Sequence, residues 1–452
     1  MKEVVVTGIG ALCSLGIDPD IIWQRLLNGD SICETTPGAW QNYDDFQSHL
    51  WSPLPPLDFT QWGFGRLDHM RFDTVSLMSC AAVNQALDHA GFDLVALDRK
   101  KSRFSIEGLD AQRSGVFIGT GIGGIHTTLG THMFHGLNRA KQRLNHQLEL
   151  GQPGTLSETV QDVMASLPIE RRFNPLAVTM LMSNAVAASP AIRFGLSGPV
   201  KTCNSACASG TVAIGEAFKA IQSGSIDMAA CGGSEFLDDE YGSIFRSYDI
   251  TGALTSNGPS ASDYRGPFDR GRSGFLFSQG GAAALILESE EHARARDARV
   301  LARVRSFAES FDAYNMIAMD SDAPRIRGML NVALGEAGLE ANDISYINAH
   351  GTGTEQNDAI ETAVLGEMFP HGPWINSSKG ALGHTIGASG ALEAITCVQA
   401  LISQKLHPCA HLHEPLDSIR LVQEIENDRI EHVLSQSFAF GGHNACLILS
   451  GP

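Results

Sequence analysis

The segment KTCNSACASGTVAIGEAF, residues 201–218, places two cysteines four residues apart among small side chains, directly before a helical pattern. Three interpretations are open: a metal site, a disulfide, or one reactive thiol at the start of a helix. The hydrophobic pattern continues to Gly224, so Cys207 stands near the first turn of the expected helix. Unpaired backbone N–H groups at a helix start favour the thiolate, which is the nucleophilic form of cysteine.

The surroundings of this segment favour the reactive thiol over the other two interpretations. A zinc site normally adds a second close pair of cysteine or histidine ligands, and nothing near Cys203 and Cys207 supplies one, so we expect no metal. The chain has nine cysteines, an odd number, and most lie inside apolar runs, which is typical of reduced thiols. We interpret Cys203 as an ordinary buried cysteine and Cys207 as the nucleophile.

The composition excludes several functional classes. With 452 residues, of which 43% are hydrophobic and 18% are charged, the chain is typical of a soluble globular protein. Its net charge of −18 argues against a general affinity for nucleic acid or for an anionic membrane. No uninterrupted apolar run is long enough to span a bilayer, and the N-terminus does not resemble a signal peptide. We therefore expect a cytoplasmic protein without a nucleic-acid or membrane partner.

Short apolar strands that end in small-residue loops recur along the chain, for example at GVFIGTGIGGI, residues 115–125. Helical patterns at 73–91, 206–222 and 387–403 lie between such strands, and this alternation predicts an α/β architecture with buried sheets. The stretch 255–274 is rich in glycine, serine and proline, which favours a boundary there. We expect two domains, residues 1–260 and 261–452.

Two histidines stand in glycine-rich loops that follow or precede regular elements. His350 ends the apparent strand of YINAHGTGTEQND, and His384 lies in SSKGALGHTIGASG before a helix, five residues after Lys379. A thiol that accepts acyl groups needs partners for the negative charge that develops on its substrate. We expect His350 and His384 to be these partners of Cys207.

Four motifs resemble, in their order and approximate spacing, the β-ketoacyl-acyl carrier protein synthases, which are elongating type II condensing enzymes with a Cys-His-His site. The motifs are SACASG, NAHGTGTEQND, KGALGHTIGASG and SFAFGGHNA. The similarity extends from VVVTGIGALCSLG to the last strand, ACLILS. It implies the thiolase-like fold, in which two similar α/β halves pack in five layers (α-β-α-β-α) with a cap over the entrance.

The resemblance also implies roles for individual residues. Cys207 would be the acylated nucleophile, His350 and His384 would donate hydrogen bonds to the malonyl thioester carbonyl, and Lys379 would hold the local charge network. The residues implied for substrate binding are Thr352 and Thr354 on the pantetheine arm, Phe440 as an aromatic gate, and Glu393 as the acidic partner of the lysine.

The implied reaction is a decarboxylative Claisen condensation between an acyl-enzyme thioester and malonyl-acyl carrier protein, in fatty acid or polyketide and polyene biosynthesis. No cofactor is expected, because phosphopantetheine arrives on the carrier protein. The expected partners are acyl- and malonyl-loaded acyl carrier protein and a second subunit, in a homodimer or in a heterodimer with a chain-length subunit. Two alternatives stay open: a non-catalytic chain-length subunit and a ketosynthase-fold acyltransferase, although the intact Cys207, His350 and His384 argue against both.

The chain departs from the family pattern at two places. Ser273 and Gln279 in GRSGFLFSQGGA replace acids, which predicts weaker carboxylate support for the lysine and histidine network. In DITGALTSNG, residues 249–258, the arginines that typically meet an acidic carrier protein are missing. Docking must then use other cations, and the candidates are Arg66 and Arg71 or the cluster Arg139, Lys141 and Arg143.

Overall fold

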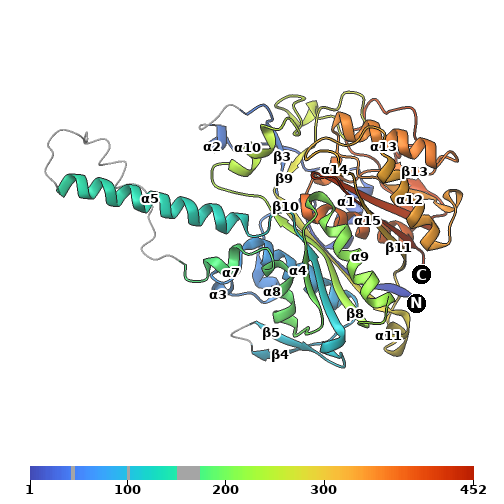
Figure 1. Ribbon diagram of the computed structural model, residues 1–452, viewed down its shortest axis with the longest axis horizontal. Coiled ribbons are helices and arrows are strands. Elements are labelled where there is room, and N and C mark those ends of the chain that lie inside the picture. Colours follow the sequence, from blue (N-terminus) through green and yellow to red (C-terminus); the bar gives the residue numbers. More distant parts are fainter. Residues whose placement is uncertain (42–45, 99–101, 150–173) are drawn as a thin grey trace.

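The computed structural model describes residues 1–41, 46–98, 102–149 and 174–452 (Figure 1). A ten-stranded sheet runs through it in the order β13-β12-β16-β17-β11-β1-β10-β8-β6-β7. One half of the sheet contains β1 (Val4–Leu12), β6 (Ser114–Gly119), β7 (Val200–Cys203), β8 (Met228–Phe236) and β10 (Gly280–Ser289). The other half contains β11 (Ala302–Phe311), β12 (Tyr346–Asn348), β13 (Trp374–Asn376), β16 (His432–Ala439) and β17 (His443–Ser450).

The two halves of the sheet repeat one topology. When the strands of each half are numbered in chain order, both halves read 3-2-4-5-1 from the outer edge to the centre. They meet where β1 pairs with β11 over only three residue pairs, from Val4 with Val304 to Val6 with Ala302. The predicted pair of similar α/β halves is therefore confirmed.

Two helices lie between the halves, and this central layer positions the functional site. Helices α9 (Ser209–Gln222) and α15 (Ser389–Ser403) each contact strands of both halves and share one hydrophobic core with them. Helices α4 (Thr74–His89) and α8 (Ala185–Phe194) cover the outer face of the first half, and α12 (Pro324–Ala337) and α13 (Glu355–Met368) cover that of the second (Figure 1). The layers follow the predicted thiolase-like α-β-α-β-α order.

Helix α15 is apolar because it is buried from all sides. The window Ile386–Ser403 is the one segment of the described chain with the length and hydropathy to cross a membrane, and 89% of it is buried inside the protein. A helix that is hydrophobic around its whole circumference is expected in the core of a layered protein. We therefore assign its apolar character to the central layer.

The glycine- and serine-rich stretch 255–274 is packed against the protein. Tyr264 and Phe268 within it are fully buried, and strand β10, which follows it, completes the first half of the sheet. In the sheet, the change from one half to the other falls between Ser289 and Ala302. The domain division predicted between residues 260 and 261 lies before that point, in the loop that leads to β9 (Phe277–Ser278).

The remaining helices and strands lie outside these five layers. Helix α5 (Ile125–Glu149) projects away from the body of the protein (Figure 1). The other helices near the described core are α1 (Pro19–Leu27), α2 (Gly38–Gln41), α3 (Arg66–His69), α7 (Ala177–Leu181), α10 (Ser243–Asp249), α11 (Glu290–Ala295) and α14 (Lys379–Leu382). Short pairings join β2 (Glu34–Thr35), β3 (Leu50–Ser52) and β9, then β4 (Leu94–Asp98) with β5 (Arg103–Ile106), and β14 (Lys405–Leu406) with β15 (Glu426–Asn427).

Candidate active site

Cys207 lies in a tight turn between β7 and the start of α9. The turn is a single 3-10 turn, Ala206–Ala208, and Ala206 adopts a left-handed backbone with φ of 46°. The same arrangement precedes α15, where Ile386 has φ of 49° and the sequence Ala-Ser-Gly again follows. Gly387 occupies the position that Cys207 has in the first half, and a Cβ there would lie 2.4 Å from the backbone nitrogen of Gly121. Only one of the two related turns therefore has room for a nucleophile.

The sulfur of Cys207 is buried but reaches the wall of a cavity. Cys207 is 6% exposed, and the backbone N–H groups of Cys207 and Phe440 donate hydrogen bonds to its sulfur. Burial raises the pKa of the Cys207 thiol to about 12, although the charge of Lys379 and these N–H groups act in the opposite direction. The structure thus favours a neutral resting thiol, against the sequence-based expectation of a thiolate.

His350 follows β12 and is held in one tautomer by Lys379. The Lys379 ammonium group lies 3.3 Å from His350 Nδ1 and donates a 2.6 Å hydrogen bond to the His350 carbonyl oxygen. Because an ammonium group can only donate, Nδ1 accepts and the ring proton is on Nε2. Burial, followed by the charge of Lys379, holds the pKa of His350 well below its usual range, so the ring is neutral.

His384 has the same protonation state for a different reason. Its Nδ1 accepts from the backbone N–H of Ile386 at 3.3 Å and lies 2.9 Å from the Ser389 hydroxyl. The remaining proton is therefore on Nε2. Burial, followed by the charge of Lys379, also holds the pKa of His384 well below its usual range. Phe275 packs edge-on against the ring at 5.0 Å and restricts its orientation.

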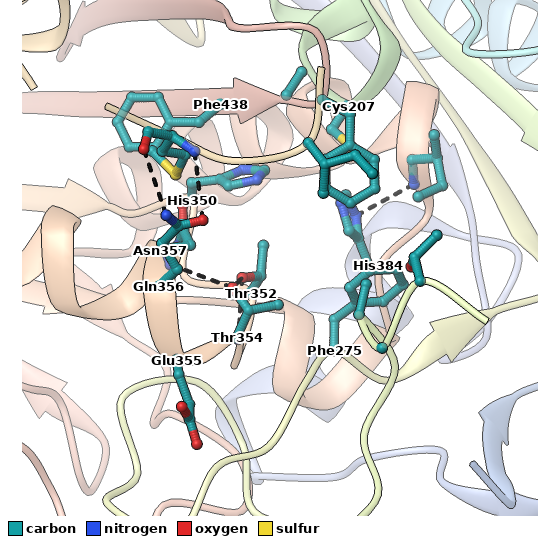
Figure 2. Close-up of a pocket in the computed structure, with 18 of the residues that line it drawn as sticks. Cys207, Phe275, His350, Thr352, Thr354, Glu355, Gln356, Asn357, His384 and Phe438 are labelled. Carbon is teal, nitrogen blue, oxygen red and sulfur yellow. Dashed lines mark hydrogen bonds between the residues drawn. The ribbon is translucent and has the colours of Figure 1, made fainter. Parts of the chain in front are cut away.

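Cys207, His350 and His384 line one cavity of about 300 Å³ (Figure 2). The two imidazole rings are perpendicular, with centroids 5.6 Å apart, and Phe438 packs against His350 at 5.7 Å. The structure therefore brings together the three residues that the sequence predicted as a nucleophile with two partners. Two neutral N–H donors beside one thiol suit a carbonyl oxygen that becomes negatively charged.

Lys379 and Glu393 form a buried ion pair behind the two histidines. Both side chains are almost fully buried, and the Lys379 ammonium group donates to a Glu393 carboxylate oxygen. The predicted partnership of these residues therefore exists in the structure. Glu393 is not among the residues that line the cavity. It lies buried on α15 and contacts the lysine, so the structure does not place it with the substrate-binding residues.

The other residues predicted to bind substrate do line the cavity. The hydroxyl groups of Thr352 and Thr354 form a 2.9 Å hydrogen bond. Thr354 also caps α13 by accepting from the Asn357 N–H. Phe440 forms part of the wall of this cavity and of a second cavity of about 330 Å³ between α5 and α10. A side chain that borders two cavities is placed to separate or connect them.

Sequence reasoning missed two acids that shape the His350 loop. Glu361 accepts from the backbone N–H groups of His350 and Gly351, at 2.6 and 2.7 Å. Asp358 accepts from Thr352 N–H at 3.1 Å, and the same carboxylate accepts from the N–H groups of Gly353 at 3.2 Å and Phe268 at 2.8 Å. Their spacing of three within the helix after the HGTGT loop is a signal that could have identified them, because it directs both carboxylates to one face.

A third acid, Glu235, connects the Ile386 turn to the loop that follows β6 and was also missed. It accepts from the backbone N–H groups of Ile122 and Gly387, at 3.2 and 3.1 Å, and from that of Gly121. Burial raises the pKa of Glu235 to about 7, against the effect of these donors. Its place at the end of a buried strand, in CGGSE, is the available sequence signal.

Ser273 and Gln279, which replace acids of the family pattern, bond to other parts of the protein than the lysine and histidine network. Gln279 accepts from the Leu54 N–H at 2.7 Å and donates to Asp238 at 3.0 Å, which fastens β9 to the segment after β3. Ser273 lines the cavity and accepts from the Ser256 N–H at 2.9 Å. Lys379 has its carboxylate partner in Glu393, and weaker carboxylate support from the two replacements stays a prediction.

The predicted carrier-docking cations lie away from the cavity wall. Arg66 begins α3 and Arg71 follows it, whereas Arg139 and Lys141 lie on α5; none of the four lines the cavity. The side chain of Arg143 is outside the described residues.

Over the described chain, no group of three or more histidine, cysteine, aspartate or glutamate residues is arranged to hold a metal ion.

The chain matches two family models in succession. Residues 1–293 match the beta-ketoacyl synthase N-terminal domain, and residues 301–413 match the beta-ketoacyl synthase C-terminal domain. Among curated proteins, 3-oxoacyl-[acyl-carrier-protein] synthase 2 of Synechocystis sp. is 30% identical over 454 residues, which cover 99% of this chain and 97% of that protein.

Solved structures agree with this match. The ishigamide ketosynthase/chain length factor superposes with a TM-score of 0.78 at 26% identity and covers 100% of this chain and 99% of its own. A beta-ketoacyl synthase from Burkholderia phymatum STM815 gives a TM-score of 0.80 at 29% identity, with complete coverage of both chains. The chain described here belongs to the beta-ketoacyl synthase family of acyl-transferring enzymes.

Proposed function

We propose that this enzyme condenses an acyl group held on Cys207 with malonyl-acyl carrier protein, and so lengthens the acyl chain by two carbons. The observation that carries the proposal is the shared cavity in which the Cys207 sulfur meets two neutral histidines with their N–H groups available. The name of the Synechocystis relative, which specifies a carrier-linked substrate, supports the same reaction class.

The first step transfers the acyl group from a carrier thioester to Cys207. The sulfur forms a bond with the acyl carbon, the bond from that carbon to the pantetheine sulfur breaks, and the thiol proton leaves on the pantetheine thiol. The N–H groups of Cys207 and Phe440 converge on the sulfur, where they can also stabilise the oxyanion of the tetrahedral intermediate. Thr352 and Thr354 provide hydroxyl groups along the cavity for the pantetheine amides.

The second step is decarboxylation of the malonyl group. The bond to the carboxylate breaks, CO₂ leaves, and the electron pair forms an enolate whose oxygen accepts from Nε2–H of His350 and of His384. Each such donor in a site without water is worth about 3 kcal/mol. The carbanion then attacks the acyl carbon; the bond to the Cys207 sulfur breaks, and this sulfur takes up one proton.

The same site explains why neutral histidines suit this chemistry. A protonated imidazole would also donate, but the Lys379 ammonium group beside both rings disfavours a second positive charge. Glu393 offsets the lysine charge on the core side. The reaction proposed for these residues uses no resident metal or cofactor, since the phosphopantetheine arm arrives with the carrier protein.

We further propose that the enzyme works in the cytoplasm as a dimer, with itself or with a chain-length subunit. Strand β7 is an edge strand of the sheet, and apolar side chains are exposed on it and on the neighbouring helices α7 and α8: Val200 (41%), Val178 (64%) and Ile192 (59%). An exposed edge bordered by apolar residues is typical of a subunit interface. The nine free cysteines suit a reducing compartment.

The proposal is tested with two variants and intact-mass measurement. Wild-type protein incubated with an acyl-carrier protein should gain one acyl mass, and Cys207→Ala should gain none. His350→Ala should still be acylated at Cys207, yet release CO₂ from malonyl-acyl carrier protein 100- to 1,000-fold more slowly, on the order expected for loss of one oxyanion donor. Acylation that persists without Cys207, or normal CO₂ release without His350, would contradict the assigned roles.

A further inference from the structure

Exposed apolar side chains surround the mouth of the active-site cavity. We call this set the rim patch; it consists of Ile250 (68% exposed), Tyr314 (63%), Met316 (75%) and Ile317 (57%). Ile317 itself lines the cavity, and Ile250 directly precedes the lining residues Thr251, Gly252 and Ala253. The rim patch is therefore continuous with the cavity that contains Cys207.

The exposure of the lining residues shows which end of the cavity is the mouth. Cys207, His350 and His384 are buried, whereas Ile317, Glu355 and Gln356 are exposed. An acyl group must pass the exposed residues to reach the sulfur. A protein that carries this group on a flexible arm must therefore rest against the rim patch while the arm is inside.

The mouth offers a docking protein apolar area and little positive charge. Glu355 is the acidic residue among the lining residues of the described chain, and none of them is a lysine or an arginine. The guanidinium group of Arg272, the residue before the lining residue Ser273, turns inward: its side chain is 9% exposed, it pairs with Asp358, and it donates to the Thr354 and Glu355 carbonyl oxygens. Contact at this rim must come mainly from apolar surface.

We propose that the rim patch is the docking surface for the carrier protein and that it recognises an apolar face beside the carrier's pantetheine attachment point. This inference rests on the proposed function and adds the chemistry of the partner. Exposed apolar side chains gathered beside an active-site mouth are typical of a surface that a partner covers. At protein interfaces, a few large apolar side chains commonly contribute most of the affinity.

The test compares a carrier-bound donor with a carrier-free donor. The probes are octanoyl-loaded bacterial type II acyl carrier protein and octanoyl-pantetheine, and the readout is the rate at which Cys207 gains the octanoyl mass. The test variant is Ile250→Glu combined with Met316→Glu, because both residues belong to the rim patch and neither lines the cavity. The matched control is Val332→Glu on α12, where an exposed apolar residue (52%) lies outside the cavity lining.

We expect the double variant to raise the KM for the carrier-bound donor at least tenfold while the rate with octanoyl-pantetheine stays within twofold, and we expect the control to change neither. Equal losses with both donors would overturn the inference, because the mouth itself would then be damaged. An unchanged KM for the carrier-bound donor would also overturn it. So would a dimer that dissociates in the double variant, because a second copy of the chain would then cover the rim patch. Failure of the proposed function gives a different result: wild-type protein acylated by both donors but unable to condense.

Discussion

At the scale of single residues, the main question is how a buried thiol becomes a nucleophile. The helix-start position of Cys207 favours the thiolate, whereas burial raises its pKa to about 12 and outweighs the nearby N–H groups and Lys379. Both histidines are neutral and hold their protons on Nε2. The resting site is therefore uncharged at its reactive end, and charge develops only when a thioester is bound.

The pH dependence of Cys207 alkylation tests this account. Below the pKa, the thiolate fraction rises tenfold for each pH unit, so a thiol with a pKa near 12 should react steadily faster from pH 6 to pH 9 without a plateau. The measurement is the iodoacetamide rate by intact mass, with Cys207→Ala as the blank for the other cysteines. A plateau near pH 7 would show that the helix start dominates and that the thiolate is the resting form.

At the scale of elements, the close approach of α9 to the second half of the sheet fixes the nucleophile. Gly215 in the middle of α9 faces the ring of Phe307 on β11, and a Cβ at this position would lie 2.2 Å from ring atoms. Phe307 is 1% exposed and cannot move into solvent. The absence of a side chain at Gly215 therefore allows the central helix to pack against both halves.

Two glycine substitutions separate this packing effect from helix propensity. Gly215→Ala should destabilise the protein by about 1–3 kcal/mol, because overpacking exceeds the gain in propensity. Gly328→Ala on α12 is the matched control, since nothing lies within 4 Å of its Cβ, and it should stabilise by about 0.5–1 kcal/mol. Denaturant unfolding measures both changes. A stabilising effect at both positions would show that α9 is less tightly packed than described.

At the scale of the whole molecule, the unpaired edge of the sheet is the surface that we propose for assembly. The outer edge of β7 is unpaired within the described chain, and Ile192 on the adjoining helix α8 is exposed. The strand also leads directly into the Cys207 turn. Association at this edge would therefore fix the start of the active site as well as bury apolar surface.

Charge at this edge should dissociate the assembly. Ile192→Glu combined with Val200→Glu places two like charges among the exposed apolar side chains of this edge, and burial of an unpaired charge costs several kcal/mol. Sedimentation should show a dimer for the wild type and for Val332→Glu, and a monomer for the double variant. A wild-type monomer at micromolar concentration, or a double variant that stays dimeric, would place the interface elsewhere.

Local sequence determined much of the fold and the identity of the reactive groups. The alternation of buried strands with helices predicts the α/β layers, because burial on both faces of a sheet requires continuous apolar strands. The small residues around Cys207 and the glycine loops around His350 and His384 mark the positions where the chain turns sharply. Such signals are local, and they need no knowledge of what lies across the molecule.

Tertiary structure alone decided the protonation states and the supporting contacts. The sequence could not indicate that Glu361 would accept from the His350 loop, that Gln279 would fasten β9 instead of supporting Lys379, or that burial would oppose ionisation of Cys207. Desolvation and hydrogen bonding depend on which distant segments surround a group. For this reason, the sequence predicts which residues can react, but only the packed structure determines the charge that they carry.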